Sequence, residues 1–212
     1  MSLISNKTNF IFFHLYKCGG NSFRKVITDL KIPTNEWGGV HGLPLDVKKH
    51  YELNVGMDKF ENLFKFTFIR NPFDFLVSTY FYGKSYPNHF MHRPIVENNM
   101  TMEEFVLYYS NVRLEHQNPS KRPFGSNKVV TFKDWLLDEN GNEIMDYVGK
   151  LETMDKDIKV IFEKLNLPIS KAPIINVNPN RDKDYRKYYN DKSRALVESA
   201  FDWSLRKYDY TF

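Results

Sequence analysis

The chain has 212 residues, of which 42% are hydrophobic and 16% aromatic, and its formal net charge is +4. This length fits one domain that buries roughly 70% of its unfolded surface. The mild basicity favours an anionic ligand but lacks the basic tracts of a nucleic-acid-binding protein. A single cysteine, Cys18, excludes an internal disulfide, and the spacing of Cys and His residues indicates no metal cluster.

The start of the chain is polar. Residues 1–8 are expected to form a short tail without the apolar region of a signal peptide, and no stretch approaches the ~18 apolar residues of a membrane span. A cytoplasmic protein follows as the default expectation. We expect one domain over residues 1–212, in which residues 84–143 are an insertion.

An apolar, aromatic run over residues 9–16 predicts a buried strand. A turn with two glycines follows it, and apolar residues spaced by three and four then predict a helix over 20–31. A strand, a glycine turn and a helix aim backbone N–H groups and a positive helix end at one spot, which suits a phosphate or sulfate. The candidate ligand groups are Lys17, Cys18, Gly19, Gly20, Asn21 and Ser22, and Asn21 or Ser22 can also cap the helix.

Two familiar nucleotide motifs are absent from this turn. A Walker A loop places its lysine after the glycines, whereas Lys17 comes before them. The Gly-x-Gly-x-x-Gly fingerprint of dinucleotide-binding proteins is also missing. A glycine turn with one lysine is common in α/β proteins, so an ordinary turn without a ligand stays an alternative at this point.

A second polar turn follows the apolar strand predicted over residues 63–69. Asn71 is a good helix cap, and proline at the next position is a good first helical residue. Ser78 lies seven residues beyond Asn71, so both share one face of this helix, in the direction in which Arg70 leaves the strand. Arg70 and Ser78 can therefore hold one anion, although an exposed arginine and a serine bonded to its own helix are the alternative. The buried stripe is predicted to hold Phe73, Leu76, Val77 and Tyr80.

The remaining elements alternate between helix and strand. Helices are predicted over 45–53, 102–109, 131–137, 153–166 and 191–203, and a strand over 144–151. Residues 84–99 and 170–184 are expected to be irregular. Alternating strands and helices indicate an α/β fold with a central parallel sheet flanked by helices, in which ligands bind beyond the carboxyl ends of the strands. Both polar turns lie at such ends, so a ligand with two anionic groups is expected.

These two turns resemble the motifs of the sulfotransferase superfamily, in particular its carbohydrate branch with heparan sulfate 2-O-sulfotransferase-like enzymes. Residues 14–22 read His-Leu-Tyr-Lys-Cys-Gly-Gly-Asn-Ser, which is similar to the family's His-x-Pro-Lys-x-Gly-Gly-Thr-Ser. Residues 70–80 read Arg-Asn-Pro-Phe-Asp-Phe-Leu-Val-Ser-Thr-Tyr, which resembles Arg-Asn-Pro-x-Asp-Arg-x-Val-Ser-x-Tyr. The resemblance implies a single P-loop NTPase-like sulfotransferase domain.

The resemblance also implies a reaction: transfer of a sulfuryl group from 3′-phosphoadenosine 5′-phosphosulfate (PAPS) to an acceptor hydroxyl of a carbohydrate by in-line displacement, without a metal. Lys17 would stabilise charge on the leaving oxygen, and Gly19, Gly20, Asn21 and Ser22 would hold the 5′-phosphate. Arg70 and Ser78 would hold the 3′-phosphate. A late loop that closes over the nucleotide would contribute Asn176, Asn178, Arg181 and Lys183.

The sequence defines the residues that contact the acceptor less clearly, and the insertion over residues 84–143 is expected to lie on the acceptor side. His41, in a glycine-rich loop after the first helix, is the predicted general base, with Glu36 and Glu152 as alternatives. His116 and Gln117 resemble family positions that face the acceptor. Two other functions stay open: a kinase-like phosphotransferase, which would require magnesium, and a non-catalytic protein that binds an anionic ligand.

Overall fold

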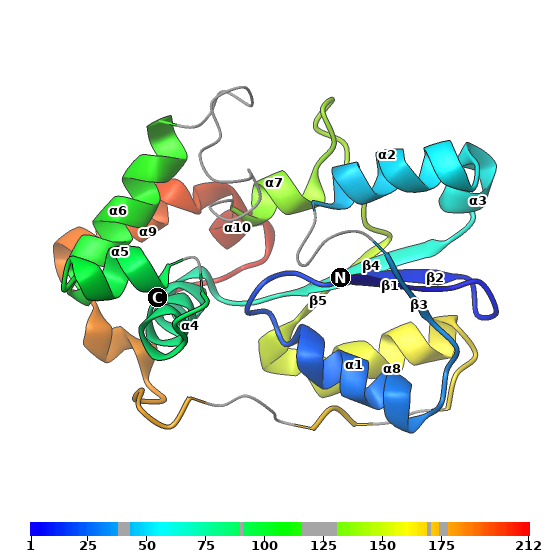
Figure 1. Cartoon of the computed structure of the whole chain (residues 1–212), viewed down its shortest axis with the longest axis horizontal. Helices are drawn as coiled ribbons and strands as arrows, with labels where there is room; N and C mark the ends of the chain where they lie inside the picture. The colour runs from blue at the N-terminus through cyan, green and yellow to red at the C-terminus, as the bar shows by residue number, and fades with distance from the viewer. Residues whose placement is uncertain (38–42, 90, 116–130, 169–170, 174–177) are drawn as a thin grey trace. The chain divides into compact units, whose positions relative to one another are not determined.

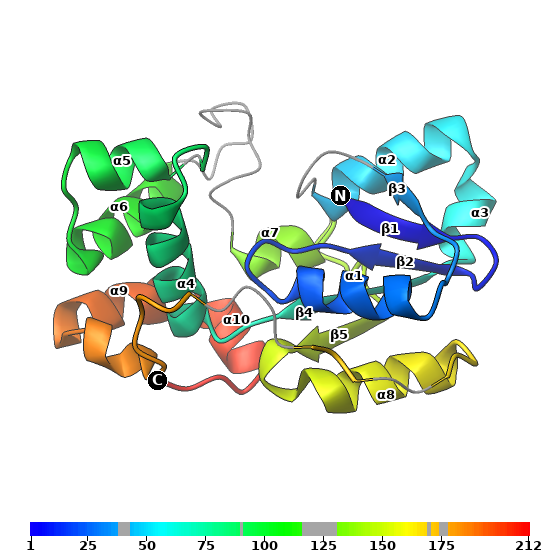
Figure 2. The same cartoon turned by 60° about the horizontal axis from the view of Figure 1, so that its bottom comes forward.

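The computed structural model describes residues 1–37, 43–89, 91–115, 131–168, 171–173 and 178–212. The chain divides into two compact units. The first, which we call the sheet unit, comprises Met1–Arg70 and Asp134–Asn176. The second, the helical unit, comprises Asn71–Lys133 and Val177–Phe212. Figures 1 and 2 show their elements.

The sheet unit contains a five-stranded sheet in the order β3-β1-β2-β4-β5. Its strands are β1 (Ser2–Ser5), β2 (Phe10–Phe13), β3 (Asn35–Trp37), β4 (Phe64–Ile69) and β5 (Tyr147–Lys150). Strands β2, β4 and β5 pair in parallel, with Phe12 opposite Phe66. The predicted α/β fold with a parallel centre is thereby confirmed. Strand β1 pairs antiparallel with both β2 and β3, so the sheet as a whole is mixed.

The first residues are part of this sheet. Expecting a tail over residues 1–8 was wrong, because Ser2–Ser5 form the fully buried strand β1. A tight turn ends at Asn9, whose φ of 50° lies in the left-handed region that asparagine tolerates. This turn folds β1 back onto β2. Four residues with serine at both ends carry too little apolar periodicity to be distinguished from a polar tail.

Helices cover both faces of the sheet. Helices α1 (Gly20–Asp29) and α8 (Met154–Lys164) lie on one face, and α2 (Pro44–Asn54) and α3 (Met57–Glu61) lie on the other (Figures 1 and 2). The 3-10 helix η2 (Leu151–Thr153) leads from β5 into α8. The predicted helices over 20–31, 45–53 and 153–166 are thereby confirmed.

Aromatic rings fill the core between the sheet and helices α1 and α8. The ring centroids of Phe12 and Phe23 are 4.5 Å apart, and those of Phe23 and Phe66 are 5.2 Å apart. Val26 and Ile27 of α1 and Ile158 of α8 are buried in the same cluster. This core anchors β2 and α1, and therefore the turn between them, from one side.

The helical unit is built around α4 (Pro72–Ser85). With it fold α5 (His92–Glu97), α6 (Met102–Glu115), η3 (Tyr185–Tyr188), α9 (Asp191–Ala200) and α10 (Asp202–Lys207). Helix α7 (Phe132–Leu136) spans the division between the units. The predicted buried stripe of α4, from Phe73 to Tyr80, is confirmed. Helix α5 corrects the expectation of an irregular segment over 84–99.

Gly83 explains how α5 approaches α4. A Cβ atom at this position would lie 2.8 Å from Cδ1 of Ile95 and 3.1 Å from Cβ of Met91. The missing side chain therefore lets the two helices touch. None of the described helices is long and apolar enough to cross a membrane.

Candidate anion-binding site

The turn between β2 and α1 places backbone N–H groups at a helix start. Gly19 is the N-cap of α1, with a left-handed φ of 80°. Its carbonyl accepts hydrogen bonds from the N–H groups of Ser22 (2.9 Å) and Phe23 (3.2 Å). The N–H groups of Gly20 and Asn21 belong to the first helical turn, where no intrahelical acceptor exists. They are therefore suited to bind an anion.

The predicted cap by Asn21 or Ser22 is wrong, because the N-cap Gly19 carries no side chain and makes no side-chain capping bond. Asn21 is exposed, whereas Ser22 is buried. We call residues 17–22 the glycine loop.

Neighbouring side chains press closely on the glycine loop. A Cβ atom on Gly19 would lie 2.5 Å from Cδ1 of Leu151 and 2.7 Å from Cε of Met154. A Cβ atom on Gly20 would lie 1.9 Å from Cδ2 of His14. The start of α8 and the His14 ring therefore occupy the space that side chains would need, which makes His14 a packing partner of the loop.

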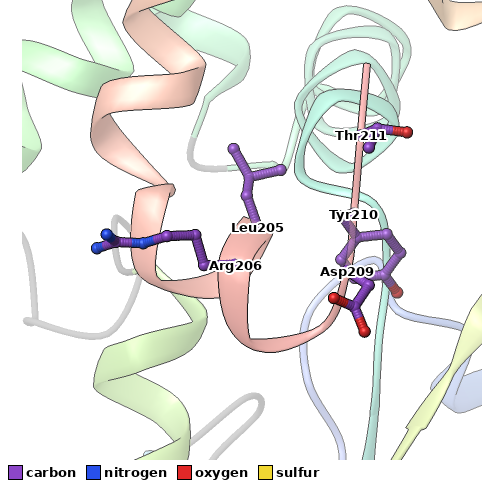
Figure 3. A pocket seen from close by; sticks show the side chains of 5 residues that line it. All are labelled: Leu205, Arg206, Asp209, Tyr210 and Thr211. Atoms are coloured by element: carbon purple, nitrogen blue, oxygen red, sulfur yellow. The ribbon is translucent and has the colours of Figure 1, made fainter.

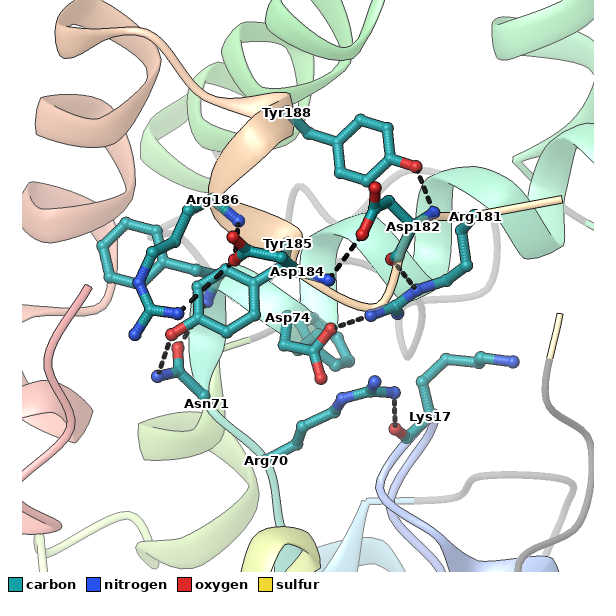
Figure 4. Close-up of polar contacts among 12 residues, drawn as sticks. Lys17, Arg70, Asn71, Asp74, Arg181, Asp182, Asp184, Tyr185, Arg186 and Tyr188 are labelled. Carbon is teal, nitrogen blue, oxygen red and sulfur yellow. Dashed lines mark hydrogen bonds and ion pairs between the residues drawn. The ribbon is translucent and has the colours of Figure 1, made fainter. Parts of the chain in front are cut away.

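Two cations lie at the carboxyl ends of neighbouring parallel strands. Arg70 follows β4, and its Nη1 donates a hydrogen bond to the carbonyl of Lys17, 3.4 Å away (Figure 4). Three residues before Arg70, within β4, Oγ1 of Thr67 donates to the carbonyl of Phe13 at 2.7 Å. The Lys17 side chain extends away from Arg70 in Figure 4. The turn after β2 and the end of β4 are thus joined, as the strand order requires.

Cys18 fills the inside of the turn. Its side chain is 1% exposed. Burial raises the pKa of the Cys18 thiol; the charge of Glu152 adds to this increase, while Arg70 and Lys17 oppose it. A neutral, enclosed thiol is a poor nucleophile, so Cys18 contributes to the site through its backbone and its volume.

The helical unit brings three further predicted residues to one face of α4. Ser78 is half-buried on this helix. Arg181 forms an ion pair with Asp74, one turn before Ser78 (Figure 4). The amide of Asn178 donates to the carbonyl of Phe81 at 3.3 Å and to Oγ of Ser85 at 3.4 Å. Asn178 and Arg181 therefore lie along the face of α4 that carries Ser78.

Other predicted residues are not brought to this face or cannot be placed. Lys183 is exposed to solvent. His41, His116, Gln117 and Asn176 lie outside the described residues. Of the alternative bases, Glu36 forms an ion pair with Arg24 and so has a structural partner. Glu152 is exposed, close enough to affect the pKa of Cys18.

Asn71 and Asp74 make contacts that were not predicted from the sequence. Asn71 was expected only as a cap, which is confirmed: Oδ1 accepts from the N–H of Phe73 at 3.0 Å. Its Nδ2 also donates to the carbonyl of Thr211 (2.8 Å) and to the hydroxyl of Tyr185 (3.1 Å). A carboxylate such as Asp74 in the first turn of a helix is explained by the helix dipole alone. The one sign in the sequence of a further role is that Asp74 lies one turn before Ser78, on the same face of α4.

A shallow pocket of about 390 Å³ lies elsewhere in the helical unit (Figure 3). It is lined by Leu205, Arg206, Asp209, Tyr210 and Thr211. Arg206 forms an ion pair with Asp202. None of the residues predicted to bind the nucleotide lines this pocket, so we place the candidate site at the glycine loop.

A glycine loop at a helix start, with cations at the ends of parallel strands, defines an α/β protein equipped to bind phosphate or sulfate groups. The family model described as the sulfotransferase family matches residues 1–208. The chain therefore belongs to the sulfotransferase family, its fold is consistent with that family's, and it is a transferase of sulfuryl groups.

A relative is an uncharacterised protein from Archaeoglobus fulgidus. It is 27% identical over 133 residues, which cover 63% of this chain and 91% of that protein. No solved structure matches the chain.

Proposed function

We propose that this protein transfers the sulfuryl group of PAPS to a hydroxyl of a saccharide. The observation that carries the proposal is the glycine loop, where free N–H groups at the start of α1 lie beside Lys17 and Arg70 in a chain of the sulfotransferase family. Support for a saccharide comes from the resemblance of residues 14–22 and 70–80 to the carbohydrate branch, including heparan sulfate 2-O-sulfotransferase-like enzymes.

Residues of the sheet unit would act on the 5′ end of the donor. The glycine loop would hold the 5′-phosphate through residues 18–22, chiefly through the N–H groups of Gly20 and Asn21, and the Lys17 ammonium would stabilise negative charge on the leaving oxygen. The bond from sulfur to the 5′-phosphate oxygen breaks while a bond to the acceptor oxygen forms, and the acceptor proton passes to a base. Arg70 would bind the 3′-phosphate from the end of β4.

Residues of the helical unit would complete recognition of the 3′-phosphate. Ser78 can donate its hydroxyl proton, and Arg181 can donate from its guanidinium. Asn178, Asn176 and Lys183 would belong to the loop over the nucleotide. His41 would be the general base, and His116 and Gln117 would contact the acceptor. No metal takes part in this proposal.

The direct test is transfer of labelled sulfate from PAPS to a panel of oligosaccharides. We expect Lys17→Ala to lower kcat/KM by about 10²–10³-fold, the usual cost of removing one donor to developing charge. Lys25→Ala is the matched control, because Lys25 is exposed on α1 and paired with Asp29. Equal activity of the two variants would remove Lys17 from the mechanism, and transfer to no saccharide would overturn the acceptor class.

The base is tested separately. His41→Ala should lower kcat by about 10²–10⁴-fold while the Kd for the nucleotide stays unchanged, since general acid–base catalysis is worth that much. Full activity of this variant would remove His41 as the base without affecting the assignment of the donor.

A further inference from the structure

Asp74 and Arg181 form an ion pair within the helical unit that differs from ordinary surface pairs (Figure 4). The side chain of Arg181 is 11% exposed and that of Asp74 is 18% exposed. Most other ion pairs of this unit have both side chains more than 40% exposed, as Arg206–Asp202 and Arg194–Glu198 do. Charges that are largely covered must be well oriented to offset the loss of hydration.

The pair lies on the face of α4 that carries Ser78. Asp74 and Ser78 are four residues apart, so they are neighbours on the helix surface. Asn178 bonds to the carbonyl of Phe81 and to Ser85, further along the same helix. Ser78 thus lies between the two places where this segment is attached to α4.

Two of the guanidinium nitrogens of Arg181 are occupied. Nη2 donates to Oδ1 of Asp74, and Nε donates to the carbonyl of Asp182 at 3.3 Å. Nη1 has no acceptor among the residues that the structure describes. Because the guanidinium is planar and rigid, fixing two nitrogens also fixes the direction of the third.

We propose that Asp74 is a positioning residue that holds Arg181 so that Nη1 donates to a phosphate bound at Ser78. This inference rests on the proposed function, which identifies that group as the 3′-phosphate of the nucleotide. Asp74 itself does not touch the nucleotide. A carboxylate beside an anion site serves here to orient the arginine, and the arginine supplies the attractive charge.

The test compares two nucleotides that differ only in the 3′-phosphate. Binding of 3′-phosphoadenosine 5′-phosphate (PAP) and of adenosine 5′-monophosphate (AMP) is measured by calorimetry on the full chain. The proteins are the wild type, Asp74→Asn, Arg181→Gln and the double variant. Asp202→Asn is the matched control, because Asp202 also lies in the first turn of a helix and pairs with an arginine.

We expect Asp74→Asn to weaken PAP binding about tenfold and to leave AMP binding unchanged, since charge-assisted hydrogen bonds are worth about that factor. Arg181→Gln should have at least the same effect. Adding Asp74→Asn to Arg181→Gln should change nothing further, because the carboxylate acts only through the arginine. Asp202→Asn should leave the preference for PAP intact.

The two proposals fail in different ways. A wild type that binds PAP no better than AMP would contradict the 3′-phosphate site, and with it the proposed function. A wild type that prefers PAP, together with an Asp74→Asn variant that keeps the full preference, would overturn the role of Asp74 alone. If Asp74→Asn does not fold, an unchanged preference in Arg181→Gln overturns the inference in the same way.

Discussion

The glycine loop depends on two positions where a side chain has no room. Gly19 combines a left-handed φ of 80° with close contact to Leu151 and Met154, and Gly20 faces the His14 ring. The loop backbone is therefore clamped between the start of α8 and the end of β2. A clamped backbone keeps its N–H groups oriented before an anion arrives, which reduces the cost of binding.

Gly141 is the reference for measuring how much stability a side chain at Gly19 would cost through steric overlap alone. It has nearly the same φ, 83°, but a Cβ atom there would meet nothing within 4 Å. Gly141→Ala should lower the free energy of unfolding by about 1–2 kcal/mol, the cost of a left-handed backbone. Gly19→Ala should cost a further ~1–3 kcal/mol from overpacking and should weaken PAP binding. Urea denaturation measures both, and equal losses would contradict the close packing at Gly19.

Cys18 should make stability depend on pH on the alkaline side. Burial raises the pKa of its thiol in the folded protein, while the unfolded thiol ionises near pH 8.5. The stabilisation is complete below that pH and is lost as pH rises, with a slope of up to about 1.4 kcal/mol per pH unit.

Cys18→Ala is the comparison for this prediction. Urea denaturation between pH 8.5 and 9.5 should show a flatter decline for the variant, because tyrosines ionise only near pH 10 in the unfolded chain. A decline as steep as that of the wild type would contradict an enclosed, neutral thiol.

The residues of the glycine loop could be predicted because their chemistry is local. A lysine, two glycines and polar residues between a strand and a helix indicate an anion site whatever surrounds them. Two features could not be predicted in the same way. One is the close contact between Gly20 and the His14 ring, and the other is the pairing of Asp74 with Arg181. Arg181 and Asp74 are far apart in sequence, and only the fold brings them together.

The start of α4 is the element on which the second polar turn depends. Asn71 caps this helix and also bonds to Thr211 and Tyr185. The ring of Phe212 packs against that of Phe73, with centroids 4.9 Å apart. The end of the described chain therefore fastens the first turn of α4, which begins directly after Arg70.

Asn71→Ser separates the capping of α4 from the two hydrogen bonds that the Asn71 amide donates to Thr211 and Tyr185. Serine still caps a helix, but it cannot reproduce both amide bonds. We expect a loss of about 1–3 kcal/mol, because two part-buried hydrogen bonds, each worth about 0.5–1.5 kcal/mol, are lost. Asn190→Ser is the matched control, since Asn190 caps α9 and its amide makes one solvent-exposed bond, to Glu103, among the residues that the structure describes. Thermal unfolding should show the larger loss for Asn71→Ser, and the opposite order would contradict its fastening role.

The long helices and the short strands β2 and β5 could be predicted, whereas β1, β3 and α5 could not. The period of α1, α4 and α8 was clear because each has a buried stripe over ten or more residues. Strands β1 and β3 have four and three residues, too few to show a period. Helix α5 was not predicted because it contains Pro94, although proline is tolerated in the first turn of a helix.

At the scale of the whole molecule, the predicted nucleotide contacts come from both compact units. The sheet unit holds the glycine loop and Arg70, and the helical unit holds Ser78, Asn178 and Arg181. The alternation of strands and helices predicted the α/β class, but not the antiparallel β1, which pairs through a turn of a few residues. Domain organisation as a single domain over residues 1–212 stays a prediction.

The most direct test of the central claim is thermal stabilisation by PAP, with ATP plus magnesium as the comparison. At about 100 times its Kd, PAP should add ~2.7 kcal/mol and raise Tm by roughly 5–10 °C. Arg70→Ala and Ser78→Ala should reduce this shift, whereas Arg206→Ala, at the separate shallow pocket, should not. A shift with ATP and magnesium but none with PAP would contradict the account and favour a phosphotransferase, and no shift with either would favour a protein that binds another anion.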